Sequence, residues 1–291
     1  MKHESALLSG CCGSTASYGK IAEMDYDYIE LSARQLMTLS DEEFRSFLTL
    51  YRNTGFPCRG FNDFCGPELP LVGPESSLNA LTRYTEQVCM RGQALGIRTV
   101  GIGAPQARRL PEGYPAERAD AEMAAFLRAA SPIAARYGIV LLVEAVHQYL
   151  CNYMTRTEDA LKMVRSLQLP NVLMVLDYYH AQVMGEDLHA LAGVMPFVRH
   201  LHISTNLEHH VRGFLRQEDL ALTCALLEEA VRSGYRGGIS VEAAADFLEA
   251  DGAACAKRMR QVLRQVCGDF PRDNPSHPEP AASCEQPPAM G

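Results

Sequence analysis

The sequence predicts an α/β protein with a single (β/α)8 TIM-barrel domain over residues 1–268. Two observations carry this prediction. Short apolar, β-branched runs recur along the chain, and a segment with the period of an amphipathic helix follows each of them. These strand-and-helix units number eight in about 268 residues, which matches a closed barrel of parallel strands in count and in length. A doubly wound parallel sheet is the alternative fold.

The predicted strands are continuous apolar runs, which are typical of strands covered on both faces. They lie at residues 6–12, 26–32, 56–64, 98–104, 139–145, 171–177, 198–204 and 237–243. No repeat of fixed period and no linker divides residues 1–268, so we expect one domain.

Three of the intervening helices have recognisable ends. The segment 40–55 begins with Ser40 as a cap, carries acidic residues in its first turn and ends at Gly55. A second helix starts at Thr157 and stops at Pro170, and a third, within 215–235, closes at Gly234. After the last helix, residues 269–291 are Pro-rich and lack an apolar period, so we expect a disordered tail.

Composition limits the partners and the compartment. The net charge of −8 repels phosphate backbones, which argues against a nucleic-acid partner. The sequence has no apolar run of 18 or more residues, so we expect no membrane span. Ten cysteines are scattered through apolar segments without a CxxC pair, as buried thiols in a reducing compartment would be. We therefore expect a cytoplasmic protein.

Residues that can bind a metal follow the last four predicted strands. Chemistry in a (β/α)8 barrel lies at the C-terminal ends of its strands. Glu144, Asp177, His202 and Glu242 all stand there. Each alone has an ordinary explanation as a helix cap, a loop residue or a core histidine, but four at the same depth predict a common site. One imidazole and three carboxylates suit one divalent ion, Mn²⁺ first, with Mg²⁺ or Co²⁺ as alternatives.

Segments 138–153, 171–182, 198–204 and 234–243 resemble the xylose isomerase-like barrel superfamily, the sugar isomerase/epimerase group with ketose 3-epimerases and hydroxypyruvate isomerases. Segments 60–74 and 101–113 resemble the ends of that group's third and fourth strands. The resemblance implies a carbohydrate substrate and one divalent metal held by the four strand-end residues. It also implies that His180, in the DxxH pattern, contacts the substrate.

Such a metal would acidify the C–H beside a carbonyl and stabilise the enediolate that forms. Glu144 and Glu242 are the natural pair to remove and return the proton. Glu30 and Asn62, near the ends of the second and third strands, are expected to line the pocket, although capping explains each equally well. We therefore expect an isomerase or epimerase that acts on a keto sugar or related polyol.

The sugar-facing positions depart from the ketose 3-epimerases. Leu150 stands where they have a sugar-binding Glu, and Glu208 stands where they have an Arg; Arg212 is close but out of register. Glu208 is retained as a substrate contact. His147, where Asn is common, could act as an acid or base in an elimination. A lyase of the same superfamily, resembling inosose dehydratases or enzymes that cleave C-glycosides, is therefore the alternative.

Two further readings are weaker. A DNA-repair endonuclease of this fold needs metal ligands from early strands, and no histidine lies between His3 and His147. A non-catalytic binding subunit would be expected to lose a ligand, and none is lost. Arg108 and Arg109 are expected to be a solvated pair. As partners we expect a small carbohydrate substrate and either a homo-oligomer or a small partner subunit.

Overall fold

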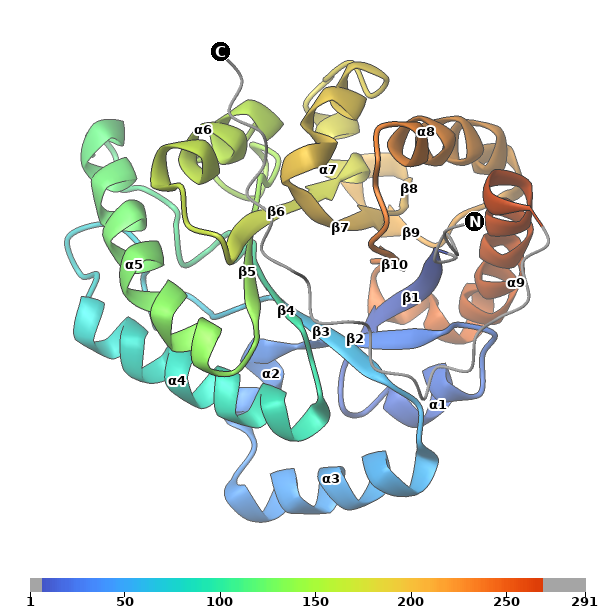
Figure 1. Cartoon of the computed structure of the whole chain (residues 1–291), viewed down its shortest axis with the longest axis horizontal. Coiled ribbons are helices and arrows are strands. Elements are labelled where there is room, and N and C mark those ends of the chain that lie inside the picture. The colour runs from blue at the N-terminus through green and yellow to red at the C-terminus, as the bar shows by residue number, and fades with distance from the viewer. Residues whose placement is uncertain (1–6, 269–291) are drawn as a thin grey trace.

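The structure, a computed structural model, describes residues 7–268, and its strands close into a parallel barrel (Figure 1). The strand order around the barrel is β1-β10-β7-β6-β5-β4-β3-β2. The strands are Leu8–Gly13 (β1), Tyr28–Ser32 (β2), Cys58–Asn62 (β3), Thr99–Ile102 (β4), Val140–Glu144 (β5), Val172–Asp177 (β6), Val198–Ile203 (β7) and Gly238–Val241 (β10). The predicted (β/α)8 fold is thus confirmed over the doubly wound sheet, which would be open. The predicted tail at 269–291 lies outside the described residues.

Helices surround the barrel on its outside (Figure 1). They are Tyr18–Ala22 (α1), Ala33–Thr38 (α2), Asp41–Thr54 (α3), Leu78–Leu95 (α4), Ala116–Arg136 (α5), Thr157–Leu167 (α6), Tyr178–Val183 (α7), Leu220–Arg232 (α8) and Leu248–Cys267 (α9). Short 3-10 turns cover Ala190–Phe197 (η1), Glu208–His210 (η2), Gln217–Asp219 (η3) and Ala245–Phe247 (η4). Within residues 7–268, none of the helices has the length and apolar character needed to cross a bilayer.

Each of the eight predicted runs overlaps one barrel strand, but the bounds differ: β1 ends at Gly13, one residue past its run, and several other runs extend beyond their strand. The run at 56–64, for example, gives only Cys58–Asn62. Phe64 lies past the strand end and is still fully buried, with its ring 5.2 Å from that of Tyr84 and 5.7 Å from that of Phe126. The loop therefore contributes to the core as the strand does, and hydrophobicity alone does not mark the boundary.

The helix ends follow their capping chemistry. Ser40 and Glu43 form a reciprocal capping box before α3, and Gly55 ends the helix in the left-handed conformation. α6 stops before Gln168, earlier than the predicted stop at Pro170, because Gln168 itself takes the left-handed conformation. α8 begins later than predicted, since η3 precedes it.

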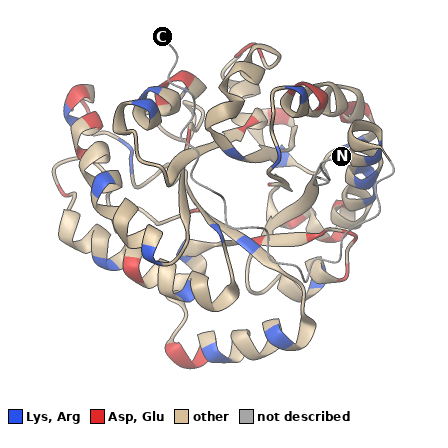
Figure 2. Ribbon diagram, in the orientation of Figure 1, with Lys and Arg blue, Asp and Glu red and all other residues tan. Residues whose placement is uncertain are grey.

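The strand register brings the predicted ligands to one end of the barrel. Asp177 pairs with His202 across β6 and β7, and Ser240 of β10 pairs with His202 on the other side. The backbone of Glu242 donates to Ile203 O at 3.1 Å, directly after β10. Figure 2 shows acidic and basic residues along the outer helices, where many of them are exposed. The charged groups inside the barrel therefore need a different explanation.

Candidate metal centre

The four predicted ligands meet at the C-terminal end of the barrel. Ligand atoms of Glu144, Asp177, His202 and Glu242 all lie within 4.8 Å of one another. His202 Nδ1 is 3.1 Å from Glu242 Oε2, 3.4 Å from Glu144 Oε1 and 3.9 Å from Asp177 Oδ2. Three carboxylates that converge in a buried site repel one another unless a cation joins them. The donor set of hard oxygens with one imidazole fits a divalent ion such as Mn²⁺, Mg²⁺ or Co²⁺.

Asp177 has both of the roles that the sequence allowed for it. Its Oδ1 accepts from Tyr179 N at 2.8 Å and from His180 N at 3.4 Å, so it caps α7. Its Oδ2 is the atom that lies toward His202. Burial raises the pKa of Asp177, but Arg212, His180 and His202 outweigh it and hold that pKa well below the ordinary value. The cap therefore orients an ionised ligand.

Glu144 ends β5 and fits against a glycine. A Cβ on Gly103, just past β4, would lie 2.4 Å from Glu144 Oε2, so only glycine leaves room for the carboxylate in this position. Burial raises the pKa of Glu144, and the neighbouring His202 only partly offsets this effect. Glu144 is thus the carboxylate at this site with an increased affinity for a proton.

Arg212 belongs to the site, which sequence reasoning missed. The strands Thr205–Asn206 (β8) and Arg212–Gly213 (β9) pair as an antiparallel hairpin after β7. This hairpin brings Arg212 Nη1 to 2.7 Å from Glu242 Oε2, and Nη2 pairs with Asp177 Oδ2. The guanidinium also lies 4.6 Å from the centre of the Tyr179 ring. The register argument against Arg212 was wrong because the hairpin folds back.

Glu208, the residue in the expected register, begins η2 and is exposed. Its predicted role as a substrate contact stays a prediction.

Burial opposes the ionised form of Glu242, but Arg212 and His202 lower the pKa of that carboxylate below its ordinary value. The hairpin therefore supplies a fixed positive charge to the centre from Arg212.

His147 lies in the loop after β5 and is buried beside the centre. The side chain is 2% exposed, and neither ring nitrogen has a partner among the described residues. Its ring centre lies 4.9 Å from that of His180, whose Nδ1 accepts from His147 N at 3.5 Å. Burial lowers the pKa of His147 and lowers that of His180 to about 3. Both imidazoles are therefore neutral at pH 7.

Aromatic rings extend from His147 along the hairpin. The rings of Tyr149 and His210 stack with their centres 4.5 Å apart and their planes 13° apart. Tyr179 donates from its hydroxyl to His210 O, and its ring centre is 5.6 Å from that of His147. His210 is exposed, and its ring packs on that of Tyr149. These rings form one aromatic surface next to the carboxylates.

The remaining predicted residues lie in different places. Asn62 is buried and donates from Nδ2 to Glu242 Oε1 at 3.4 Å, so it contacts the ligand group directly. Glu30 is buried too, but it contacts the Nε2 edge of His202, away from the other ligands. Arg108 is fully buried, which makes the expected solvated pair wrong; only Arg109 is exposed. Nothing in the sequence indicated that Arg108 would be buried.

Comparisons with known proteins agree with this architecture. A family model described as xylose isomerase-like TIM barrel matches residues 19–266. A 3-keto-D-glucoside 4-epimerase from E. coli superposes at 18% identity with a TM-score of 0.68, over 88% of this chain and 98% of that one. A D-psicose 3-epimerase from Clostridium cellulolyticum H10, solved with D-tagatose, superposes at 14% identity with a TM-score of 0.72, over 88% and 99%.

A third similar structure is the IolI protein with a bound zinc atom, at 19% identity and a TM-score of 0.68, over 89% of this chain and 98% of that one. No curated protein matches the sequence. At these identities the structural likeness shows the fold, and the chemistry has to be argued from the residues of this chain.

Proposed function

Because the chain belongs to the xylose isomerase-like TIM barrel family, we propose that it is a divalent-metal-dependent sugar isomerase or epimerase acting on a keto sugar or related polyol. The observation that carries the proposal is the convergence of Glu144, Asp177, His202 and Glu242 within 4.8 Å. Structures with this fold include two sugar epimerases and a protein that holds zinc. These neighbours support the reaction class, and the metal they suggest is left to experiment.

When bound, a divalent ion would supply Lewis acidity that weakens the C–H bond beside the substrate carbonyl. Glu144, a buried carboxylate at the end of β5, removes that proton as the general base. In epimerisation Glu242 takes up a proton from solvent and gives it to the other face of the carbon, and Glu144 then releases to solvent the proton that it removed. Arg212, which already contacts two of the carboxylates, donates to the negative oxygen of the enediolate.

The lyase alternative is kept because of His147. Its two ring nitrogens are buried without partners, and burial keeps the ring neutral, as an acid–base group in an elimination requires. The exposed aromatic surface of Tyr149 and His210 would fit an aromatic aglycone. Isomerisation remains the first proposal because it needs only the carboxylate pair.

The decisive experiment follows proton exchange in D2O by NMR, with Mn²⁺ and a panel of keto sugars, keto-inositols and oxidised glycosides. Glu144→Gln should abolish exchange. His147→Gln should stay within about tenfold of the parent, since an essential acid–base group contributes roughly 10²–10⁴-fold. Release of water or an aglycone by the parent, together with collapse in His147→Gln, would replace isomerisation by elimination.

Exhaustive chelation that leaves activity intact would contradict metal dependence. A purified protein that binds no divalent ion would favour a non-catalytic binding subunit. The cytoplasmic location and the association as a homo-oligomer or with a small partner subunit stay predictions, which cell fractionation and light scattering would test.

A further inference from the structure

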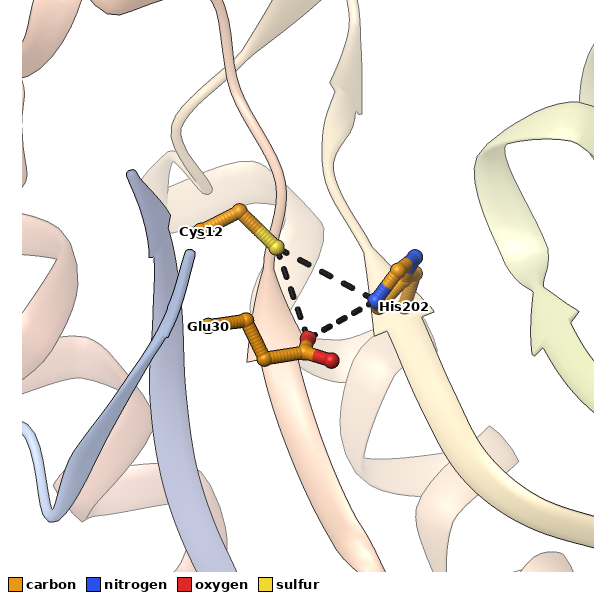
Figure 3. A group of neighbouring side chains, drawn as sticks. All are labelled: Cys12, Glu30 and His202. Carbon is orange, nitrogen blue, oxygen red and sulfur yellow. Dashed lines mark hydrogen bonds and ion pairs between the residues drawn. The ribbon is translucent and has the colours of Figure 1, made fainter. Parts of the chain in front are cut away.

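A second group of polar side chains lies inside the barrel on the far edge of the His202 ring. Figure 3 shows Cys12 of β1 and Glu30 of β2 facing His202. Glu30 Oε2 is 2.9 Å from His202 Nε2 and 2.9 Å from His200 Nε2. Cys12 Sγ donates to the same oxygen at 3.5 Å. Glu30 is 2% exposed, so these contacts are sheltered from water.

This arrangement determines which nitrogen of His202 is available. Glu30 Oε2 lies within hydrogen-bond distance of the Nε2 atoms of His202 and His200 and of the Cys12 thiol, three groups that can donate to it, and an ionised carboxylate only accepts. The hydrogen between the two residues therefore belongs to His202 Nε2. In the neutral ring Nδ1 then carries the lone pair, and Nδ1 is the nitrogen that faces Glu144, Asp177 and Glu242.

Cys12, Glu30 and His202 also have the spacing of a metal site, with ligand atoms within 4.8 Å of one another. Two observations argue against an ion there. No side-chain nitrogen or oxygen of Glu30, His200 or His202 is buried without a partner. Cys12 Sγ already donates to Glu30 Oε2 at 3.5 Å, so it is present as a thiol and not as the thiolate that metals bind. The group is complete as a hydrogen-bonded network.

The network extends down the barrel and fixes Glu30 in place. His200 Nε2 lies 3.1 Å from Ser240 Oγ, which in turn donates to Tyr28 OH at 3.1 Å. On β3, a Cβ at Gly60 would come within 2.9 Å of Glu30 Oε1. Glu30 therefore has room only where a neighbouring strand lacks a side chain, and His200 holds it there.

We propose that Glu30 is a positioning residue of the metal centre: it holds the Nε2–H tautomer of His202 and so presents Nδ1 to the ion. The sequence argument expected Glu30 to line the substrate pocket. In this proposal Glu30 contacts His202 and is not a substrate contact. The proposal rests on the metal centre of the proposed function. Carboxylate–histidine–metal arrangements of this kind contribute roughly 10–100-fold to metal affinity.

The test compares Glu30→Gln with Glu30→Leu in Mn²⁺ titrations of the full chain. The amide oxygen of Gln can still accept from Nε2–H, so Glu30→Gln should stay within a few-fold of the parent. Glu30→Leu should bind Mn²⁺ roughly 10–100-fold more weakly. Glu122→Leu is the matched control, since Glu122 accepts from Gly73 N at 2.7 Å and from Tyr114 OH at 2.6 Å, far from the ligands in sequence. Equal affinity of Glu30→Leu and the parent would overturn the proposal.

Histidine NMR on ¹⁵N-labelled protein provides a readout that needs no activity and no ion. His202 of the parent should be protonated at Nε2, and Glu30→Gln should keep that proton. A parent without a proton at Nε2 would overturn the proposal even if Glu30→Leu fails to fold. A thiolate-to-cobalt absorption band that Cys12→Ser removes would also overturn it, because the ion would then lie at Cys12. A parent that binds no ion refutes the proposed function, while the NMR result still decides the role of Glu30.

Discussion

Arg212→Met should strongly destabilise the metal-free protein. The side chain is the cation paired with both Asp177 and Glu242, and only 16% of it is exposed. Met keeps much of its length and its contact with Tyr179 but removes the charge. Asp177 is fully buried, so its carboxylate would lose its strongest cationic partner without gaining water.

The magnitude follows from the cost of breaking a buried ion pair, about 3–5 kcal/mol. For a domain of this size each kcal/mol changes Tm by roughly 2–4 °C, so the metal-free variant should melt roughly 6–20 °C below the parent. A divalent ion supplies the positive charge that the variant lacks. Saturating Mn²⁺ should therefore raise the Tm of Arg212→Met by more than it raises that of the parent.

The assay is thermal unfolding followed by circular dichroism, with chelator and with Mn²⁺, at one protein concentration. Arg216→Met is the matched control, because Arg216 is on the same segment but 57% exposed, with a contact of 3.9 Å to Glu218. Its Tm should change little in either condition. A metal-free Arg212→Met with the Tm of the parent, or an equal Mn²⁺ effect in both proteins, would refute this account of the site.

Three other predictions follow, two on the metal centre and one on buried cysteines outside it. Gly103→Ala should lower Mn²⁺ affinity in a titration, because the added Cβ would displace Glu144 Oε2. Gly101→Ala is the control: its Cβ would have its nearest contact at 3.5 Å, so this variant should bind Mn²⁺ like the parent. Equal Mn²⁺ affinities of Gly103→Ala and the parent would contradict the packing argument. Asp177→Asn should weaken Mn²⁺ binding at least 10–100-fold by calorimetry, and unchanged binding would remove Asp177 from the ligands. Cys89 and Cys255, whose pKa values burial raises to about 12 and about 11, should be alkylated slowly at pH 8 and faster as the pH rises toward those values. Peptide mass spectrometry would measure this, and labelling as fast as in urea at pH 8 would disprove it.

The ligand group was predictable from sequence because a parallel barrel brings all its strand ends to one edge. Glu144 and Asp177 end their strands, His202 is one residue before the end of β7 and Glu242 directly follows β10, so their meeting required only the count of strands. Arg212 was not predictable in this way. Its approach depends on the β8–β9 hairpin, which consists of two residue pairs and has almost no pattern in sequence.

Burial and facing direction were also beyond the sequence. Glu30 was predicted near the end of β2 and lies in the middle of that strand, but whether it faces substrate or His202 depends on the stagger between strands around the barrel. Arg108 has the same charge as Arg109 in the sequence, and only the packing of the loop after β4 separates a buried side chain from an exposed one. The residue types indicated the chemistry, but only the tertiary structure shows which groups each side chain contacts.

The column of polar groups from Tyr28 through Ser240, His200 and Glu30 to His202 limits how this barrel can be engineered. Barrel interiors are the usual target when a designer fills space with aliphatic residues to raise stability. Here such a substitution at Ser240 or Tyr28 would remove a hydrogen-bond partner that lies three or four contacts below His202 in this column. A library that randomises the lower core should therefore be screened for metal affinity as well as for melting temperature, because the two properties share the same residues.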